Sequence, residues 1–87
     1  MAHVRFPPGE RPNESREVVE FTALSGDTKI HCAISLEALA DHFGADAKGM
    51  LDAFRANRKG IEEIVAKLIT KGRFEPDGSV LVRSADC

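Results

Sequence analysis

The stretch 30–45 contains two hydrophobic periodicities in succession, and this constrains the fold more than any other feature of the chain. From 30 to 34, apolar residues occupy every second position, which is typical of a strand with one buried face. From 36 to 43, they recur at helical spacing. Ser35 lies between the two patterns and can cap the helix, and Gly44 can end it. The sequence therefore predicts a strand that runs directly into a short helix.

A second strand is predicted before this one, in the segment 17–24. Alternate residues of this segment are apolar and face one way. Gly26 lies in the short connection 25–27 and can adopt positive φ, so the two strands should form a β-hairpin. Their pairing brings three apolar residues from each strand onto one face. We expect that face to supply half of the core: Val19, Phe21, Ala23, Ile30, Cys32 and Ile34.

The segment 1–16 is predicted to be partly irregular. Val4 and Phe6 have strand spacing and indicate a short first strand. The prolines and the glycine of 7–12 should interrupt any regular element after it, and 13–16 is polar. A loop of about ten residues is long enough to be either functional or simply mobile. Because it carries no aromatic residue and no histidine, we expect it to be mobile.

A long helix is predicted after the short one, unbroken from 47 to 71, with Asp46 as its cap and Gly72 at its end. At 1.5 Å per residue it would be roughly 37 Å long, so we expect it to bend around 57–60 or to overhang the domain. A turn at 76–78 then leads to a last strand at 80–82. The pattern does not say which edge of the sheet this strand joins.

Length and composition limit the class of protein. With 87 residues, we expect a single domain, 1–87, with one modest core. A net charge of −2 with interspersed signs argues against a dedicated nucleic-acid-binding protein. The chain has no leading apolar run and no apolar stretch of membrane-spanning length, so we expect neither a signal peptide nor a membrane segment. The two cysteines suggest no disulfide framework, and we expect a cytoplasmic protein with reduced thiols.

No motif for catalysis or for a cofactor is present in the sequence. His31 and Cys32 are adjacent on a strand, so their side chains point to opposite faces and cannot bind one metal ion. No pair of histidines or cysteines has the spacing of a zinc site. Ser35 lacks the glycines of a nucleophile elbow, and no glycine-rich loop leads into a helix in phosphate-binding form. We therefore expect no metal and no cofactor, and favour a protein that is not an enzyme.

Four polar residues are the candidates for a binding site, if one exists. His42 lies at the negative end of the short helix. Arg55, Asn57 and Arg58 lie where polar residues interrupt the apolar stripe of the long helix. Because a buried guanidinium is costly unless it is paired, Arg58 should follow one of two alternatives. It turns outward to Glu62, which we favour, or it lines a polar groove with Asn57.

Several runs of this chain resemble a small bacterial family of uncharacterised proteins. The matching runs are VVEFTAL, IHCAISLEALADHFGA, AFRANRKGIEE and DGSVLVRSAD, which cover nearly the whole chain after residue 17. It is a domain-of-unknown-function family with a fold called Shew3726-like. The resemblance implies an α+β fold of the β(3)-α(2)-β kind, and it implies no activity.

The pattern and the resemblance lead to one fold prediction. We expect an α+β, two-layer β(3)-α(2)-β domain, with a small, largely antiparallel sheet and helices packed on one face. The residues expected to form the main core are Val19, Phe21, Cys32, Ile34, Leu39, Phe43, Phe54, Ile61, Val65 and Leu68.

Two functions remain open at this point. The sequence favours a non-enzymatic accessory or protein-interaction domain, with an unknown protein partner or with self-association through the long helix or a sheet edge. The alternative is a small-ligand-binding or catalytic domain that uses a polar groove near His42, Asn57 and Arg58. The absence of a convergent acid–base set favours the first. Phosphate-containing partners, including RNA, come third.

Overall fold

The computed structural model describes residues 4–45 and 49–87, and it is an α+β fold, as predicted. One five-stranded sheet consists of β1 (Val4–Arg5), β2 (Arg11–Asn13), β3 (Val18–Ser25), β4 (Thr28–Ser35) and β5 (Val80–Val82). The helices are α1 (Leu36–Phe43), α3 (Met50–Ala56), α4 (Arg58–Thr70) and the 3₁₀ helix η1 (Ser84–Asp86).

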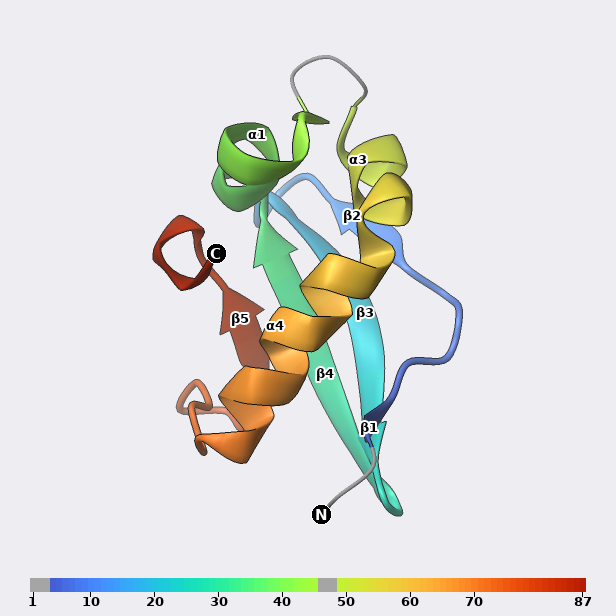
Figure 1. The fold of residues 1–87 in the computed structure, drawn as a ribbon, viewed down its shortest axis with the longest axis vertical. Helices are drawn as coiled ribbons and strands as arrows, with labels where there is room; N and C mark the ends of the chain where they lie inside the picture. Colours follow the sequence, from blue (N-terminus) through green and yellow to red (C-terminus); the bar gives the residue numbers. More distant parts are fainter. Residues whose placement is uncertain (1–3, 46–48) are drawn as a thin grey trace.

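The hairpin of β3 and β4 forms the centre of the sheet (Figure 1). Gly26, with φ 61°, connects the two strands, and Phe21 pairs with Cys32, which confirms the predicted register. β1 and β2 both pair antiparallel with β3, on the side away from β4. β5 pairs parallel with β4, and Val80 lies opposite Cys32. The sheet is therefore largely antiparallel, and the last strand, which the sequence did not place, lies beside β4.

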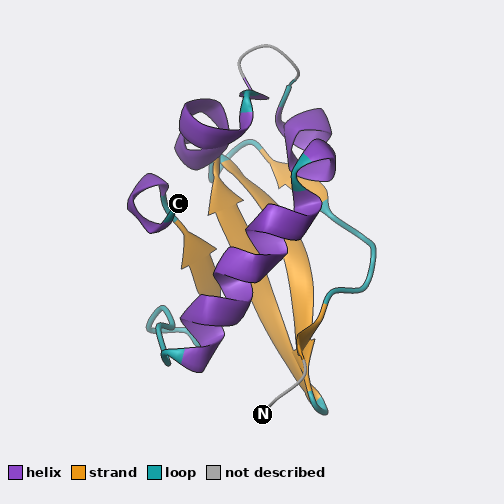
Figure 2. Cartoon of the chain, in the orientation of Figure 1, coloured by secondary structure: helices purple, strands orange, loops and turns teal. Residues whose placement is uncertain are grey.

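The helices and the sheet form two layers with the core between them. α4 crosses one face of the sheet obliquely, and α1 and α3 gather at the end where β4 leads into α1 (Figures 1 and 2). The predicted core residues are buried there, from Val19 and Ile34 on the sheet to Phe54 and Val65 on the helices. Phe43 is the exception, because it packs against the core while remaining partly exposed.

The junction of strand and short helix has the predicted caps. Ser35 Oγ accepts a hydrogen bond of 3.0 Å from the backbone N–H of Ala38. Gly44 ends α1 with φ 74°. The end of α4 follows the same rule, because Gly72 has φ 70° and the next N–H, that of Arg73, donates to Leu68 O.

The prediction of an unbroken helix over 47–71 is wrong. Asn57 has φ −118° and ψ 17°, so the chain leaves helical geometry there and α3 and α4 are separate. The break falls within the predicted bend at 57–60. The expected cap Asp46 lies outside the described residues. Neither these two helices nor any other in the described part of the chain is long and apolar enough to cross a membrane.

The segment 7–13 is not irregular throughout, because β2 lies within it. Pro12 stands opposite Val19 in an antiparallel pair. A proline is tolerated in β2 because, among the strands of 4–45 and 49–87, β2 pairs with β3 alone and is therefore an edge strand. The segment that the sequence predicted to be a mobile loop is therefore paired with the central hairpin over part of its length.

Candidate functional site

A hollow of about 430 Å³ lies on the face of the sheet opposite the helices. Ligand sites in proteins commonly have volumes of roughly 300–1,000 Å³. The side chains of β3 and β4 that point away from the core form its floor, and the segment after β1 and the turn before β5 contribute to its rim. The side chains of its lining include those of Arg11, Arg16, Glu20, Thr22, Lys29, His31, Ala33, Asp77, Ser79 and Leu81.

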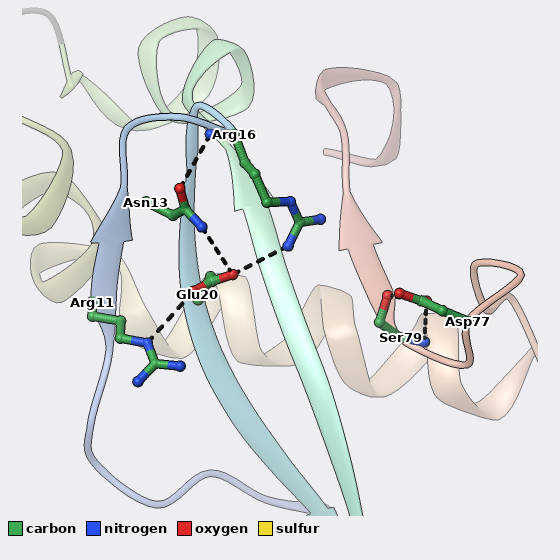
Figure 3. A network of polar contacts seen from close by, with 6 residues as sticks. All are labelled: Arg11, Asn13, Arg16, Glu20, Asp77 and Ser79. Atoms are coloured by element: carbon green, nitrogen blue, oxygen red, sulfur yellow. Dashed lines mark hydrogen bonds and ion pairs between the residues drawn. The ribbon is translucent and has the colours of Figure 1, made fainter.

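Glu20 holds two arginines at one side of this hollow (Figure 3). Its Oε1 is 3.5 Å from Arg11 Nε, and its Oε2 is 3.1 Å from Arg16 Nη1. Asn13 Nδ2 donates to the same Oε2 at 3.4 Å, while Asn13 Oδ1 accepts from the backbone N–H of Arg16 at 3.2 Å. Four residues of β2, β3 and the intervening turn thus form one polar network.

The network favours the ionised form of the Glu20 carboxyl group. Burial alone would raise its pKa, but the hydrogen bonds from Asn13 and Arg11 and the charges of Arg11 and Arg16 outweigh that effect and lower it. An ionised Glu20 in turn keeps both guanidinium groups at the edge of the hollow.

The opposite rim is formed by the turn before β5. Asp77 Oδ1 accepts hydrogen bonds from the backbone N–H of Ser79 at 3.0 Å and from Ser79 Oγ at 2.6 Å (Figure 3). These two bonds lower the pKa of Asp77, with a smaller contribution from the charge of Arg16. Arg16 therefore lies between the two acids of the hollow.

A small residue lies in the middle of this face. Ala33 on β4 stands between Glu20 on β3 and Leu81 on β5 in the register of the sheet. In the next row, Thr22 stands opposite His31. Ala33 has a shorter side chain than Glu20 and Leu81, its neighbours in this row, and it is part of the lining of the hollow.

The predicted candidates Arg55 and Arg58 converge on Glu10, on the opposite side of the chain's N-terminal segment from the hollow's arginines. Arg55 Nε is 2.9 Å from Glu10 Oε2, and Arg58 Nη2 lies directly against the buried Glu10 Oε1. The Glu10 side chain is only 8% exposed. The guanidinium of Arg58, and then that of Arg55, lower the pKa of Glu10 to about 2. The two candidates are thus paired within the molecule.

Arg58 follows neither of the two alternatives in full. It does approach Glu62, but at 3.9 Å, and its closer partner is Glu10. Its guanidinium carbon also lies 5.2 Å from the centre of the Phe54 ring. The sequence did not suggest Glu10 as a partner, because Glu10 is 48 positions before Arg58 in a segment that was expected to be mobile.

The other two candidates are engaged elsewhere. Asn57 Nδ2 donates to Phe43 O at 3.2 Å and to Ala53 O at 2.9 Å. His42 Nε2 lies 3.1 Å from Ser84 Oγ, which ties the end of α1 to η1. None of the four candidates lines the hollow on the sheet face. Among residues 4–45 and 49–87, no group of three or more potential ligands could hold a metal ion.

Sequence reasoning missed the residues of the hollow. The alternation in 17–24 places Glu20 on the face away from the core, as the structure shows, but nothing in the sequence marked it as the centre of a network. Arg11 and Arg16 reach Glu20 only because β2 pairs with β3, and the prolines around β2 argued against that pairing. The available signal was a pair of arginines, Arg11 and Arg16, near the two ends of a polar turn, with Glu20 one strand segment later.

Comparison with known proteins gives one consistent family. The model of the family described as "Protein of unknown function (DUF1488)" matches residues 4–82. Two relatives, both called "Uncharacterized protein YrdB", come from Escherichia coli (strain K12) and Shigella flexneri. Each is 35% identical to this chain over 78 residues, which covers 88% of the chain and 92% of the relative.

A solved structure has the same fold. It is the crystal structure of a protein of unknown function from the DUF1488 family of Shewanella loihica, with a TM-score of 0.80 and 26% identity. The match covers 91% of this chain and 90% of that one. These relatives confirm the resemblance that the sequence showed, and none of their names states an activity.

Proposed function

We propose that this chain, which belongs to the DUF1488 family of proteins of unknown function, is a non-enzymatic interaction domain that receives a partner protein on the open face of its sheet. The observation that carries the proposal is the hollow on that face, with its two arginines held at the rim by Glu20. Charged groups that are fixed before a partner arrives lower the entropic cost of binding.

The polar groups of the hollow suit recognition better than acid–base catalysis. Glu20 and Asp77 both have lowered pKa values, so neither is available as an acid near neutral pH. A catalytic carboxyl group typically has a pKa shifted toward the working pH, which is the opposite direction. A binding role therefore fits the electrostatics of this face.

Ser84, His42 and Asp41 meet at the end of α1, but their hydrogen bonds do not activate the serine as a nucleophile. Ser84 Oγ donates its proton to Asp41 Oδ2 at 2.8 Å, so His42 Nε2 must be the donor in its contact with Ser84. In a catalytic triad the histidine accepts the serine proton and the aspartate orients the histidine. Here the three side chains connect α1 to η1.

The alternative, a small-ligand or catalytic groove near His42, Asn57 and Arg58, has less support. Arg58 is paired with Glu10, and Asn57 is bonded to two backbone oxygens. A ligand would have to displace these contacts. A cytoplasmic location is part of the proposal, and it is supported by two cysteines that are not joined in a disulfide.

The proposal is tested by finding a partner and mapping its contact. The tagged full chain is used to capture proteins from its source bacterium, each captured protein is purified, and its Kd for the purified chain is measured by calorimetry. Thr22→Trp fills the hollow without changing charge. Thr70→Trp makes the same change at an exposed position of α4 and serves as the matched control.

We expect Thr22→Trp to weaken the reconstituted complex about tenfold or more, because a blocked contact loses more than about 1.4 kcal/mol. Thr70→Trp should leave the Kd unchanged, and both variants should melt within a few degrees of the wild type. The proposal fails if no purified protein binds, or if Thr70→Trp weakens binding as much as Thr22→Trp.

A further inference from the structure

We infer that the hollow binds an acidic segment of the partner protein, whose carboxylates pair with the guanidinium groups of Arg11 and Arg16. This inference rests on the proposed function and adds the chemistry of the partner. It follows from the balance of donors and acceptors in the hollow, from its charge and from its shape.

The two arginines keep part of their hydrogen-bonding capacity for a ligand. Arg11 contacts Glu20 through Nε, and Arg16 contacts it through Nη1. In the part of the chain that the structure describes, the terminal nitrogens of Arg11 and Nη2 of Arg16 have no side-chain partner. The two side chains are 78% and 57% exposed. A guanidinium can therefore bind a second carboxylate with its remaining edge.

The carboxylate oxygens of the hollow, in contrast, are mostly occupied, because Glu20 uses both of its oxygens and Asp77 uses Oδ1. Glu20 accepts from Arg11, Arg16 and Asn13. Asp77 accepts twice from Ser79. A site with spare donors and mostly occupied carboxylates favours a ligand that accepts hydrogen bonds.

The net charge of the hollow also favours an anionic ligand. The charged groups of the hollow are three cations, Arg11, Arg16 and Lys29, and two carboxylates, Glu20 and Asp77. Three positive and two negative charges leave a net charge of +1 in the hollow, whereas the whole chain carries −2. Lys29 has no ion pair among residues 4–45 and 49–87. The face therefore attracts anions although the protein as a whole does not.

The shape favours side chains of a protein segment over a nucleic acid. The floor around Thr22 and Ala33 is polar or small, and the aromatic residue of β3, Phe21, is buried on the other face. Single-stranded nucleic acids are commonly bound by stacking bases on exposed aromatic side chains. The hollow provides three cations but no Phe, Tyr or Trp ring on its open side, and His31 is the one aromatic side chain exposed in its lining, which suits clustered Asp and Glu side chains better than a run of stacked bases.

The inference is tested with a fluorescent hexaglutamate peptide, using hexaglutamine as the uncharged probe. Anisotropy titrations and amide shifts in a ¹⁵N spectrum are recorded at about 50 and about 200 mM salt, where screening differs strongly. We expect hexaglutamate alone to bind, to shift the amides of Arg11, Thr22 and His31, and to bind more weakly at the higher salt concentration.

Removal of the two charges should weaken this binding. Arg11→Gln with Arg16→Gln should raise the Kd of hexaglutamate about tenfold or more, because both cations that pair with its carboxylates are removed. Lys67→Gln with Lys71→Gln removes the same charge from exposed positions on α4 and the turn after it, and should change the Kd less than about twofold. Matching melting curves show that all variants are folded.

Four results would overturn the inference. The first is equal binding of both peptides, and the second is amide shifts on α4 instead of β3 and β4. The third is tighter binding of inorganic phosphate or of a single-stranded RNA oligonucleotide than of hexaglutamate. The fourth is an unchanged Kd of hexaglutamate in the double arginine variant. If the purified partner is lost with Thr22→Trp but retained with the double arginine variant, the interaction domain stands and acidic recognition fails. If no partner complex forms at all, the proposed function fails, and this inference with it.

Discussion

Glu10 shows how one residue can anchor a segment that its sequence marks as irregular. It lies two residues after the proline pair and directly before β2. Its nearly buried carboxylate pairs with Arg55 on α3 and Arg58 on α4. A buried carboxylate is costly unless it is paired, so these two arginines are what allow Glu10 to lie there. The N-terminal segment is thereby attached to both helices.

We predict that Glu10 stabilises the protein above about pH 4.5 and that this contribution disappears in acid. The pKa of Glu10 is lowered from 4.5 to about 2 in the folded chain, so folding favours the ionised form. The stabilisation is fully present above the unfolded value of 4.5 and is lost as the pH falls toward about 2. Urea unfolding should show Glu10→Gln less stable by roughly 1–3 kcal/mol at pH 7, with the difference vanishing near pH 2.

The control is Glu14→Gln, which alters an exposed acid in the neighbouring turn. It should change the free energy of unfolding by less than about 0.5 kcal/mol at either pH. A difference between Glu10→Gln and the wild type that is the same at pH 7 and pH 2 would contradict the assignment.

Cys32 is predicted to be unreactive in the folded protein. Burial raises the pKa of its thiol to about 12, and the thiolate is the reactive form. A thiol reagent at pH 8 should label one cysteine per native chain, the exposed Cys87, and a second only after unfolding in urea. Cys87→Ser should remove the native labelling. Rapid labelling of this variant without urea would mean that Cys32 is accessible.

At the scale of elements, Asn57 separates two helices that the apolar pattern joins. Its side chain donates to Ala53 O in the preceding turn of α3 and to Phe43 O at the end of α1. Asparagine side chains compete with the helical backbone for such carbonyls. The break therefore lets one residue hold the ends of α1 and α3 together at the start of α4.

We predict that Asn57→Ala destabilises the protein by roughly 1–2 kcal/mol in urea unfolding, because Phe43 O loses its side-chain donor. Helix propensity alone predicts the reverse sign, since alanine is the better helix former by several tenths of a kcal/mol. Asn57→Asp, which cannot donate, should behave like the alanine variant. Stabilisation by Asn57→Ala would show that the hydrogen bonds of Asn57 do not hold the junction.

For the molecule as a whole, the contact between Phe54 and Phe21 joins the helical layer to the sheet. The ring centres are 4.9 Å apart, and Phe54 is completely buried. Phe54 also lies beneath the guanidinium of Arg58, so the core and the Glu10 ion pairs meet at this ring.

Phe54→Ala is predicted to cost roughly 3–5 kcal/mol in urea unfolding, because the change leaves a cavity that a small core cannot close. Domains of this kind have total stabilities of only about 5–15 kcal/mol. Phe74→Ala provides the matched control, because Phe74 is 43% exposed, and it should cost less than about 1 kcal/mol. Similar losses in both variants would contradict the central role of Phe54.

Local patterns predicted the elements whose boundaries are decided by local physics. The alternation in 17–24 and 30–34, the cap at Ser35 and the glycines after α1 and α4 require only near neighbours in the chain, and the structure confirms them. The core residues followed from the same periodicity, with Phe43 the exception. The family resemblance agreed with the order of strands and helices read from the residues, and it carried no information on a site.

The sequence by itself determined the central hairpin, the strand-to-helix corner and the apolar surfaces, because backbone propensity and side-chain periodicity act over a few residues. Only the tertiary structure decided the pairing of Glu10 with Arg55 and Arg58 and the convergence of Arg11 and Arg16 on Glu20. Charges attract across any sequence separation once folding brings them together, so their partners depend on the packing of whole elements. The hollow likewise could not be predicted from the sequence, because it forms only where β2 and β5 pair with the two strands of the hairpin.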